Sequence, residues 1–176
     1  MKIKLHNVRL SFPSLFRKAT FEGKETKYEG TFLLNKEEHA EVVKKLQAAI
    51  KDMIRDDFKG QKISADRICL KDGDEIGRDG YEGTWSIKAG NNTRPVTVDR
   101  SKNPVTEDDD VFYAGCYVNA IIEFWAQNNG FGKRINANLL GVQFYKEGQP
   151  FASGEKASQD DFDMFEDEED DGDIPF

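Results

Sequence analysis

Two long segments of alternating side chains constrain the fold of this chain more than any other feature. Residues 115–127 read GCYVNAIIEFWAQ, residues 134–148 read RINANLLGVQFYKEG, and the Gly-rich stretch NNGFGK separates them. Apolar residues that recur with period two are typical of strands with one buried face. We therefore expect an antiparallel hairpin, with the core face of its first strand formed by Cys116, Val118, Ala120, Ile122 and Phe124.

Shorter strands and one helix are predicted in the rest of the chain. A tight turn at Gly90–Asn92 is expected to join a strand over residues 84–90 to a strand over residues 94–100. Asn35 and Glu38 have the spacing of a capping box, and apolar residues then recur at helical spacing as far as about Phe58. The pattern predicts a helix over about residues 36–57 and strands over residues 2–12, 27–35, 84–90 and 94–100.

These elements favour a mainly β fold. About six strands and one substantial helix favour a small, closed or nearly closed antiparallel barrel with the helix over one opening. Residues 155–176 carry too few apolar side chains to pack by themselves. We therefore expect one folded domain over residues 1–154 and a disordered acidic tail over residues 155–176.

The charge is divided sharply along the chain. All 25 Lys and Arg residues lie between Lys2 and Lys156, whereas ten of the 33 acidic residues lie within residues 157–176. The remaining 23 acidic residues leave the body with a net charge of +2, although the whole chain carries −8. Such asymmetry indicates an acidic interaction tail attached to a mildly basic domain.

Several classes of protein are disfavoured. The start of the chain has no apolar run of a signal peptide, and no stretch approaches the ~20 apolar residues of a membrane span. Two distant cysteines, Cys69 and Cys116, suggest neither a disulfide framework nor a zinc site. His6 and His39 form no metal-binding motif. We expect a soluble, intracellular protein with no membrane association, catalytic residues, metal or cofactor.

One enzymatic alternative remains open at this stage. Four of the carboxylates in the glycine-rich loop over residues 72–83 could hold Mg²⁺ for a nuclease, with Lys88 nearby. Acid-and-glycine loops are more often solvated turns. The four residues are Asp72, Asp74, Asp79 and Glu82.

Aromatic and basic residues lie side by side in several predicted strands and loops. Bases stack on aromatic rings whatever their identity, and phosphates require Lys and Arg within reach. Trp85 alternates with Ile87 and could instead be a core residue, whereas Phe131 at a hairpin tip has no evident core to enter. Phe12, Phe16, Arg17 and Lys18 form a further group of this kind. The predicted single-strand-binding residues are Trp85, Lys88, Arg94, Arg100, Phe131, Lys133 and Arg134.

The C-terminus carries a more specific signal. Its last seven residues, DDGDIPF, resemble the acidic tip of bacterial single-stranded DNA-binding proteins, which ends Asp-Asp-Asp-Ile-Pro-Phe. Gly172 replaces one Asp of that pattern. The resemblance implies a partner-binding tail whose functional residues are Asp170, Asp171, Asp173, Ile174, Pro175 and Phe176.

The body resembles a different group, the phage-encoded single-stranded DNA-binding proteins. Two stretches carry this resemblance: RPVTVDRSKNPVTEDDDVFYAGCYVNAIIEFWA and GFGKRINANLLGVQFYKEGQPF. It implies an OB-fold, binding of single-stranded DNA without sequence preference, and a role in phage replication or recombination within the host bacterial cytoplasm. Replication and recombination proteins are then the expected partners of the tail.

The division of charge between the body and the tail suggests how the two parts interact. A tethered acidic tail is expected to compete with DNA for the basic groove, so that DNA binding frees the tip for partner proteins. The tail could instead serve solubility alone, or the chain could be an acidic-tailed module that binds basic proteins. The sequence leaves oligomeric state and binding-site size open.

Overall fold

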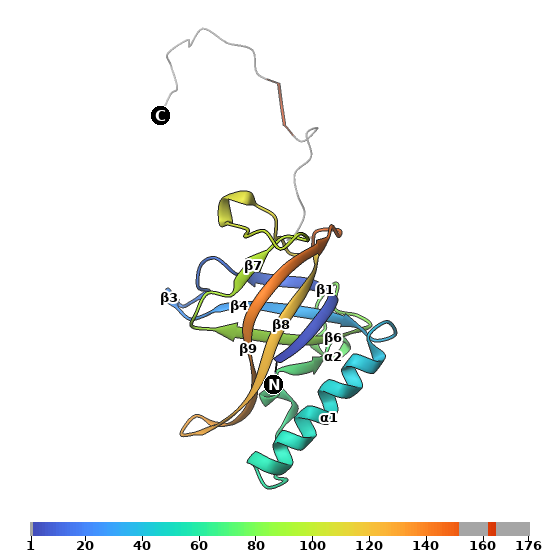
Figure 1. The fold of residues 1–176 in the computed structure, drawn as a ribbon, viewed down its shortest axis with the longest axis vertical. Helices are drawn as coiled ribbons and strands as arrows, with labels where there is room; N and C mark the ends of the chain where they lie inside the picture. The colour runs from blue at the N-terminus through green and yellow to red at the C-terminus, as the bar shows by residue number, and fades with distance from the viewer. Residues whose placement is uncertain (1, 152–161, 165–176) are drawn as a thin grey trace, which may run out of the picture.

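A computed structural model describes residues 2–151 and 162–164, and it contains a closed five-stranded β-barrel (Figure 1). The strands follow the order β6-β4-β1-β8-β9, and a parallel contact between Gly90 and Asn138 closes β6 onto β9. This is the topology of an OB-fold and confirms the predicted fold class. The barrel strands are β1 (Lys2–Ser14), β4 (Tyr28–Asn35), β6 (Thr84–Asn91), β8 (Tyr117–Asn129) and β9 (Gly132–Lys146).

The hairpin of β8 and β9 confirms the predicted core face. The side chains of Cys116, Val118, Ala120 and Ile122 are fully buried, and Phe124 packs against the same core. An irregularity in the β8–β9 register lies between Ile121 and Ile122. Period-two alternation therefore places the apolar set of this long strand inside the barrel, as the sequence indicates.

The helix α1 (Ala40–Asp57) lies along the lower end of the barrel (Figure 1) and buries Val43, Leu46 and Ile50. It begins later than predicted. The Asn35 side chain accepts hydrogen bonds from the backbone N–H groups of Glu37 and Glu38, at 2.9 and 3.0 Å. These bonds close a turn that precedes the helix, so the predicted capping residue terminates β4 instead of capping α1.

The predicted hairpin of residues 84–90 and 94–100 is wrong. Within the described strands, β6 pairs with β4 on one edge and with β5 and β9 on the other, so neither edge is free for the following strand. β7 (Val96–Val98) is instead a parallel partner of β9, where Val96 aligns with Gly141 and Val98 with Gln143.

Short elements fill the connections between the barrel strands. The loop from β1 to β4 contains a small hairpin, and the segment before β6, which includes the glycine-rich loop over residues 72–83, contains a strand and a helical turn. The remaining short elements are β2 (Thr20–Phe21), β3 (Lys24–Glu25), η1 (Ala65–Arg67), β5 (Leu70–Asp72), α2 (Gly73–Ile76) and η2 (Glu107–Asp109).

The two cysteines are free thiols. Burial raises the pKa of the Cys69 thiol to about 12 and also raises that of Cys116, which is fully buried. Both residues therefore serve as small apolar side chains and are poor nucleophiles.

The predicted domain boundary at residue 154 and nearly all of the acidic tail, including Asp170, Asp171, Asp173 and residues 174–176, lie outside the described residues. Among the helices that the structure describes, none combines the length and apolar character needed to cross a bilayer.

Candidate nucleic-acid interface

Two hairpins project from the same side of the barrel (Figure 1). The first is the β2–β3 hairpin in the connection from β1 to β4, where the Phe21 side chain is 69% exposed. The second is the turn from β8 to β9, where Phe131 is 86% exposed. In OB-folds these two connections flank the surface that binds oligonucleotides. We refer to the surface between the two hairpins as the cleft face.

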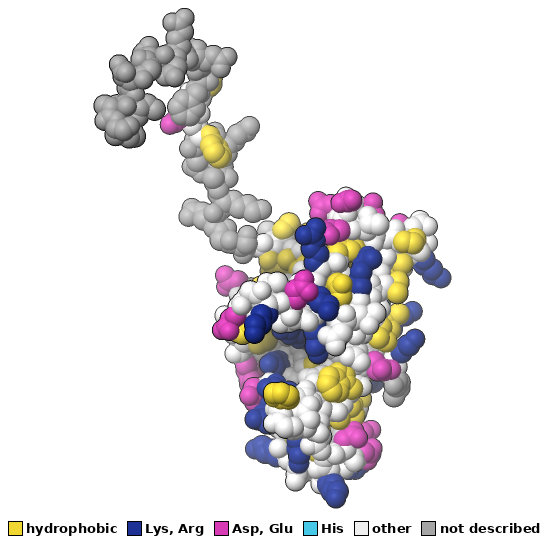
Figure 2. Space-filling model, turned by 90° about the vertical axis from the view of Figure 1, so that its left-hand side faces the viewer, with side chains coloured by type: hydrophobic (Ala, Val, Ile, Leu, Met, Phe, Trp, Pro, Cys, Tyr) yellow, Lys and Arg dark blue, Asp and Glu magenta, His cyan; other side chains and the backbone are white. Residues whose placement is uncertain are grey.

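Figure 2 faces this side of the molecule. Basic and hydrophobic side chains lie among one another over its middle and lower parts, and acidic side chains form one group at its upper end and smaller groups along its left edge and at its lower right. A surface of this composition provides cations for phosphates and flat apolar faces for bases.

The hairpin formed by β8 and β9 presents three of the predicted DNA-binding residues together. Phe131 occupies the tip, and Lys133 and Arg134 follow on β9. The Lys133 ammonium group donates a hydrogen bond to the side-chain carbonyl of Gln61 and lies 5.9 Å from the ring centroid of Phe58. The contact with the segment after α1 fixes the position of this basic side chain.

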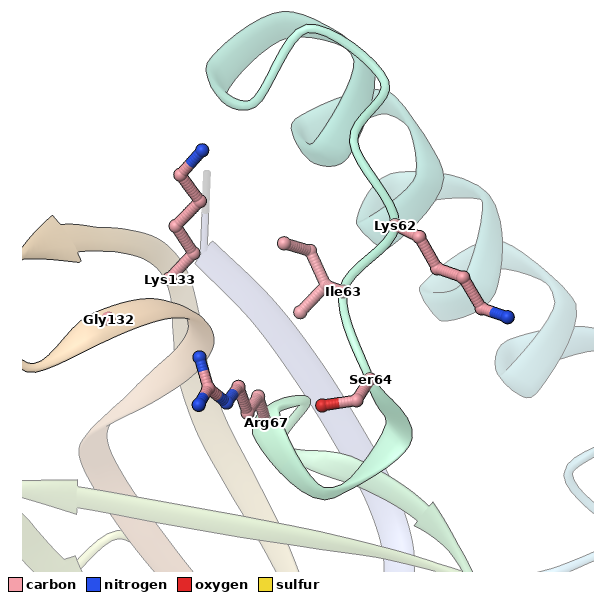
Figure 3. Close-up of a pocket in the computed structure, with 6 residues that line it drawn as sticks. All are labelled: Lys62, Ile63, Ser64, Arg67, Gly132 and Lys133. Carbon is pink, nitrogen blue, oxygen red and sulfur yellow. The ribbon is translucent and has the colours of Figure 1, made fainter.

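A pocket of about 380 Å³ lies between this hairpin and the segment after α1 (Figure 3). The side chains of Arg67 and Lys133 border the gap, whereas Lys62 points away from it (Figure 3). Gly132 adopts a φ of +107°, and a Cβ there would lie 2.9 Å from the Arg67 guanidinium. Glycine therefore permits the close approach of Arg67 to the hairpin.

An acidic residue, Asp66, lies next to the pocket-lining residue Arg67 in the sequence. The pKa of Asp66 is lowered, chiefly because the Ser64 side chain donates a hydrogen bond to its carboxylate, with smaller effects from Arg67 and Arg134. Asp66 is thus anionic at neutral pH.

The upper part of the cleft face is built where β4 begins and β6 ends. Tyr28 and Asn91 are paired there, which brings the connection from β1 beside the residues after β6. The Arg94 guanidinium lies 5.0 Å from the ring centroid of Phe16, and the Lys18 ammonium lies 6.0 Å from that of Tyr28. The structure therefore forms two cation–π pairs in this region.

Lys88 and Trp85 occupy opposite faces of β6. Lys88 is exposed and forms an ion pair of 2.9 Å with Glu29 on the neighbouring strand. Trp85 is partly buried and packs against the core, on the same side of the strand as the fully buried Ile87. The Lys36 ammonium lies 5.5 Å from the ring centroid of Trp85. A stacking role for Trp85 stays a prediction, since much of its surface already contacts the core.

Arg100 does not join the other predicted residues. It follows β7, and its guanidinium lies 5.2 Å from the ring centroid of Tyr145 on β9. The structure thus brings Phe131, Lys133 and Arg134 together at one hairpin and places Lys88 and Arg94 nearer the other, with Arg100 outside both groups.

Sequence reasoning did not assign Phe21 or Arg67 to the site. Phe21 lies in a short stretch with several charged residues, and an apolar ring in such a polar loop is the signal that could have identified it. Arg67 gains its position only through the contact of η1 with β9, for which neighbouring residues give no signal.

The glycine-rich loop over residues 72–83, whose carboxylates were considered as Mg²⁺ ligands, has a structural role. The Lys36 ammonium contacts the carboxylates of Asp72 and Asp74, both at 2.7 Å. Asp72 also caps α2, and Asp74 accepts a hydrogen bond from the backbone N–H of Gly83. Within residues 2–151 and 162–164, no group of three or more potential ligands is placed to hold a metal ion.

The barrel topology and the cleft face define the class of this protein as an OB-fold module with the features that such folds use to bind oligonucleotides. Residues 1–174 match the model of a family described as Enterobacter phage Enc34, ssDNA-binding protein. The chain belongs to this family.

Individual relatives agree with this assignment. The chain is 40% identical to protein p50 of Acyrthosiphon pisum secondary endosymbiont phage 1, over 96% of this chain and 98% of the relative. It is similar to the structure of the single-stranded DNA-binding protein from bacteriophage Enc34 in complex with ssDNA. That match has a TM-score of 0.78 and 34% identity, over 86% of this chain and 89% of the other. A second structure of the Enc34 protein matches with a TM-score of 0.77 and 33% identity, over 92% and 90% of the two chains.

The family and its structural neighbours are single-stranded DNA-binding proteins and not enzymes. This confirms the prediction of a non-enzymatic protein and removes support from the nuclease alternative. The resemblance to phage single-stranded DNA-binding proteins is confirmed as well.

Proposed function

We propose that this chain binds single-stranded DNA across the cleft face, without sequence preference, and thereby coats and protects it. The observation that carries the proposal is the pair of exposed rings, Phe21 and Phe131, on two hairpins that flank a basic surface of an OB barrel. The structure of the Enc34 relative in complex with ssDNA supports it.

The chemistry of the cleft face suits an unpaired strand. Each base that stacks on an aromatic side chain contributes about 1–3 kcal/mol, and this contribution does not depend on base identity. Lys133, Arg134 and Arg94 supply positive charge for the phosphates, so the logarithm of affinity should fall with the logarithm of salt by about 0.7 per phosphate neutralised. Duplex DNA hides its base faces and lacks the stacking contribution.

The biological role in this proposal is phage DNA replication or recombination, in the cytoplasm of the infected bacterial host. In the sequence, the apolar residues Ile174, Pro175 and Phe176 follow a run of acidic side chains, and in this proposal they act as a small apolar tip. Such a tip fits an apolar pocket with a basic rim on a replication or recombination protein. The upstream acids Asp170, Asp171 and Asp173 steer it towards that rim.

The tail is also proposed to regulate the cleft face. A short flexible tether gives an effective concentration on the order of millimolar. Residues 157–176 carry ten acidic side chains and no basic ones, so they compete with phosphates for the same cations. DNA then displaces the tail and releases its tip for partners.

A titration with fluorescent oligo-dT, with and without Mg²⁺, tests the proposed binding. Salt-sensitive binding without shortening of the oligonucleotide is the expected result. An absence of binding even in dilute buffer would contradict the proposal and favour the module that binds basic proteins. Shortening that requires Mg²⁺ would instead indicate a nuclease.

A further inference from the structure

A second cluster of aromatic and basic side chains lies outside the cleft face, on the outer surface of β1, β8 and β9 and on the loop after β7. The rings of His6 and Tyr145 meet edge to face, with centroids 4.9 Å apart. The Arg100 guanidinium lies 5.2 Å from the Tyr145 centroid. Farther along the same two strands, the Lys146 ammonium lies 4.9 Å from the ring centroid of Tyr117. We call this set of five residues the outer cluster.

A small hollow of about 170 Å³ adjoins the outer cluster and shares Arg100 and Tyr145 with it. Asn119 and Gln143 lie side by side on β8 and β9, and the Asn119 side-chain amide donates a 3.1 Å hydrogen bond to the Gln143 side chain. Arg100, Phe144 and Tyr145 complete the lining. The hollow thus combines a planar cation, an aromatic ring and amide groups, which together suit a nucleotide base and its phosphate.

The loop that carries Arg100 is held by its own backbone contacts. The Asp99 carboxylate accepts hydrogen bonds from the backbone N–H groups of Ser101 and Asn103, at 2.8 and 2.9 Å. The Gln143 side chain also donates to the Asp99 carbonyl at 3.2 Å. Arg100 is therefore presented by a fixed turn, and the Asp99 carboxylate is turned towards the loop backbone.

β7 connects the outer cluster to the cleft face. Arg94 precedes this short strand and contacts Phe16 at the cleft, whereas Arg100 follows it and contacts Tyr145. Between them Val96 is 66% exposed. A strand of DNA that leaves the cleft at Arg94 can therefore pass over β7 and meet a second cation and ring at its far end.

We infer that the outer cluster is an additional stacking site, at which Tyr145 and Arg100 bind a nucleotide of the same single strand after it has crossed the cleft face. This inference rests on the proposed function. It explains why Arg100 lies apart from the other predicted residues. It also predicts a longer occluded site than the cleft face alone provides, within the range of about 4–16 nucleotides known for OB folds.

Oligonucleotide length separates this site from the cleft. Affinity is measured at low salt with oligo-dT of about six and of about sixteen nucleotides, which lie within the range of OB-fold site sizes. Arg100→Ala and Tyr145→Ala should each weaken binding of the longer oligonucleotide by about tenfold, the loss expected for one stacked base, and leave the shorter one unchanged. Tyr145→Phe keeps the ring and should bind like the wild type.

Two controls make the test decisive. Lys51→Ala removes an exposed cation on α1 and should leave the affinity for the shorter and for the longer oligonucleotide unchanged. Thermal melting verifies that each variant is folded. Unchanged binding of the longer oligonucleotide by both alanine variants would overturn the inference, as would equal losses for both lengths. Binding of the shorter oligonucleotide by the wild type tests the proposed function separately, since it does not require the outer cluster.

Discussion

At the scale of single residues, the loop over residues 72–83 is stabilised by one partly exposed cation, Lys36. Lys36 donates hydrogen bonds to Asp72 and Asp74, and these bonds raise the pKa of Lys36. The pKa of Asp74 is lowered, chiefly by the hydrogen bond from Lys36 and to a smaller extent by the hydrogen bond from the Gly83 backbone N–H. These ion pairs thus link Lys36, directly after the end of β4, to Asp72 and Asp74 at the start of α2.

The lowered pKa of Asp74 predicts a pH-dependent contribution to stability. A carboxyl whose folded pKa lies below its unfolded value of about 3.9 stabilises the fold above that value and loses this effect as pH falls through the folded pKa. Asp74→Asn should therefore lower the melting temperature at pH 6, and the difference from wild type should narrow as pH falls below about 4. Thermal melts across this range provide the measurement.

Asp79→Asn is a matched control because Asp79 is an exposed carboxyl of the same segment. It should leave the melting temperature unchanged throughout. A deficit for Asp74→Asn that stays constant between pH 6 and pH 3 would contradict the assignment to ionisation.

At the scale of secondary-structure elements, the β8–β9 hairpin and α1 have separate roles. The hairpin extends an exposed ring, Phe131, beyond the barrel, whereas Leu46 of α1 is only 2% exposed and packs in the core. Exposed apolar side chains at a binding surface contribute to affinity, and buried ones contribute to stability.

Paired substitutions test this separation. Phe131→Ala should weaken oligo-dT binding by about five- to a hundred-fold, the equivalent of one lost stacking contact, without changing the melting temperature. Leu46→Ala should lower the free energy of unfolding by about 2–5 kcal/mol and leave the affinity of the folded protein unchanged. Binding titrations and denaturant melts measure the two effects, and unchanged affinity in Phe131→Ala would exclude its stacking role.

The sequence identified these two elements because their signals are local. Alternation along residues 116–124 depends only on neighbouring residues, and so does the helical spacing of Val43, Leu46 and Ile50. The partner of β7 could not be read in this way, because it depends on which strand edges the closed barrel leaves free. The start of α1 was misplaced because the Asn35 side chain forms the same hydrogen bonds in a turn as in a helix cap.

At the scale of the whole molecule, function depends on how distant segments meet. Aromatic residues beside basic ones in sequence indicated a single-strand surface, and the cleft face does gather Phe131, Lys133 and Arg134. Sequence could not separate Arg100 from that group, because its partner Tyr145 lies 45 positions away and reaches it only through the pairing of β7 with β9. The sequence did reveal the charge division between body and tail, which local structure does not alter.

Competition between tail and DNA for the cleft face is the central proposal about the intact molecule. It is tested most directly by equilibrium titration of oligo-dT at low salt, with the full chain and with a chain that ends at Lys156. The account predicts tighter binding by the shorter chain, and a gap between the two that narrows as salt screens the tail. Equal or weaker binding by the shorter chain would contradict the competition, and no binding by either chain would contradict the DNA-binding role itself.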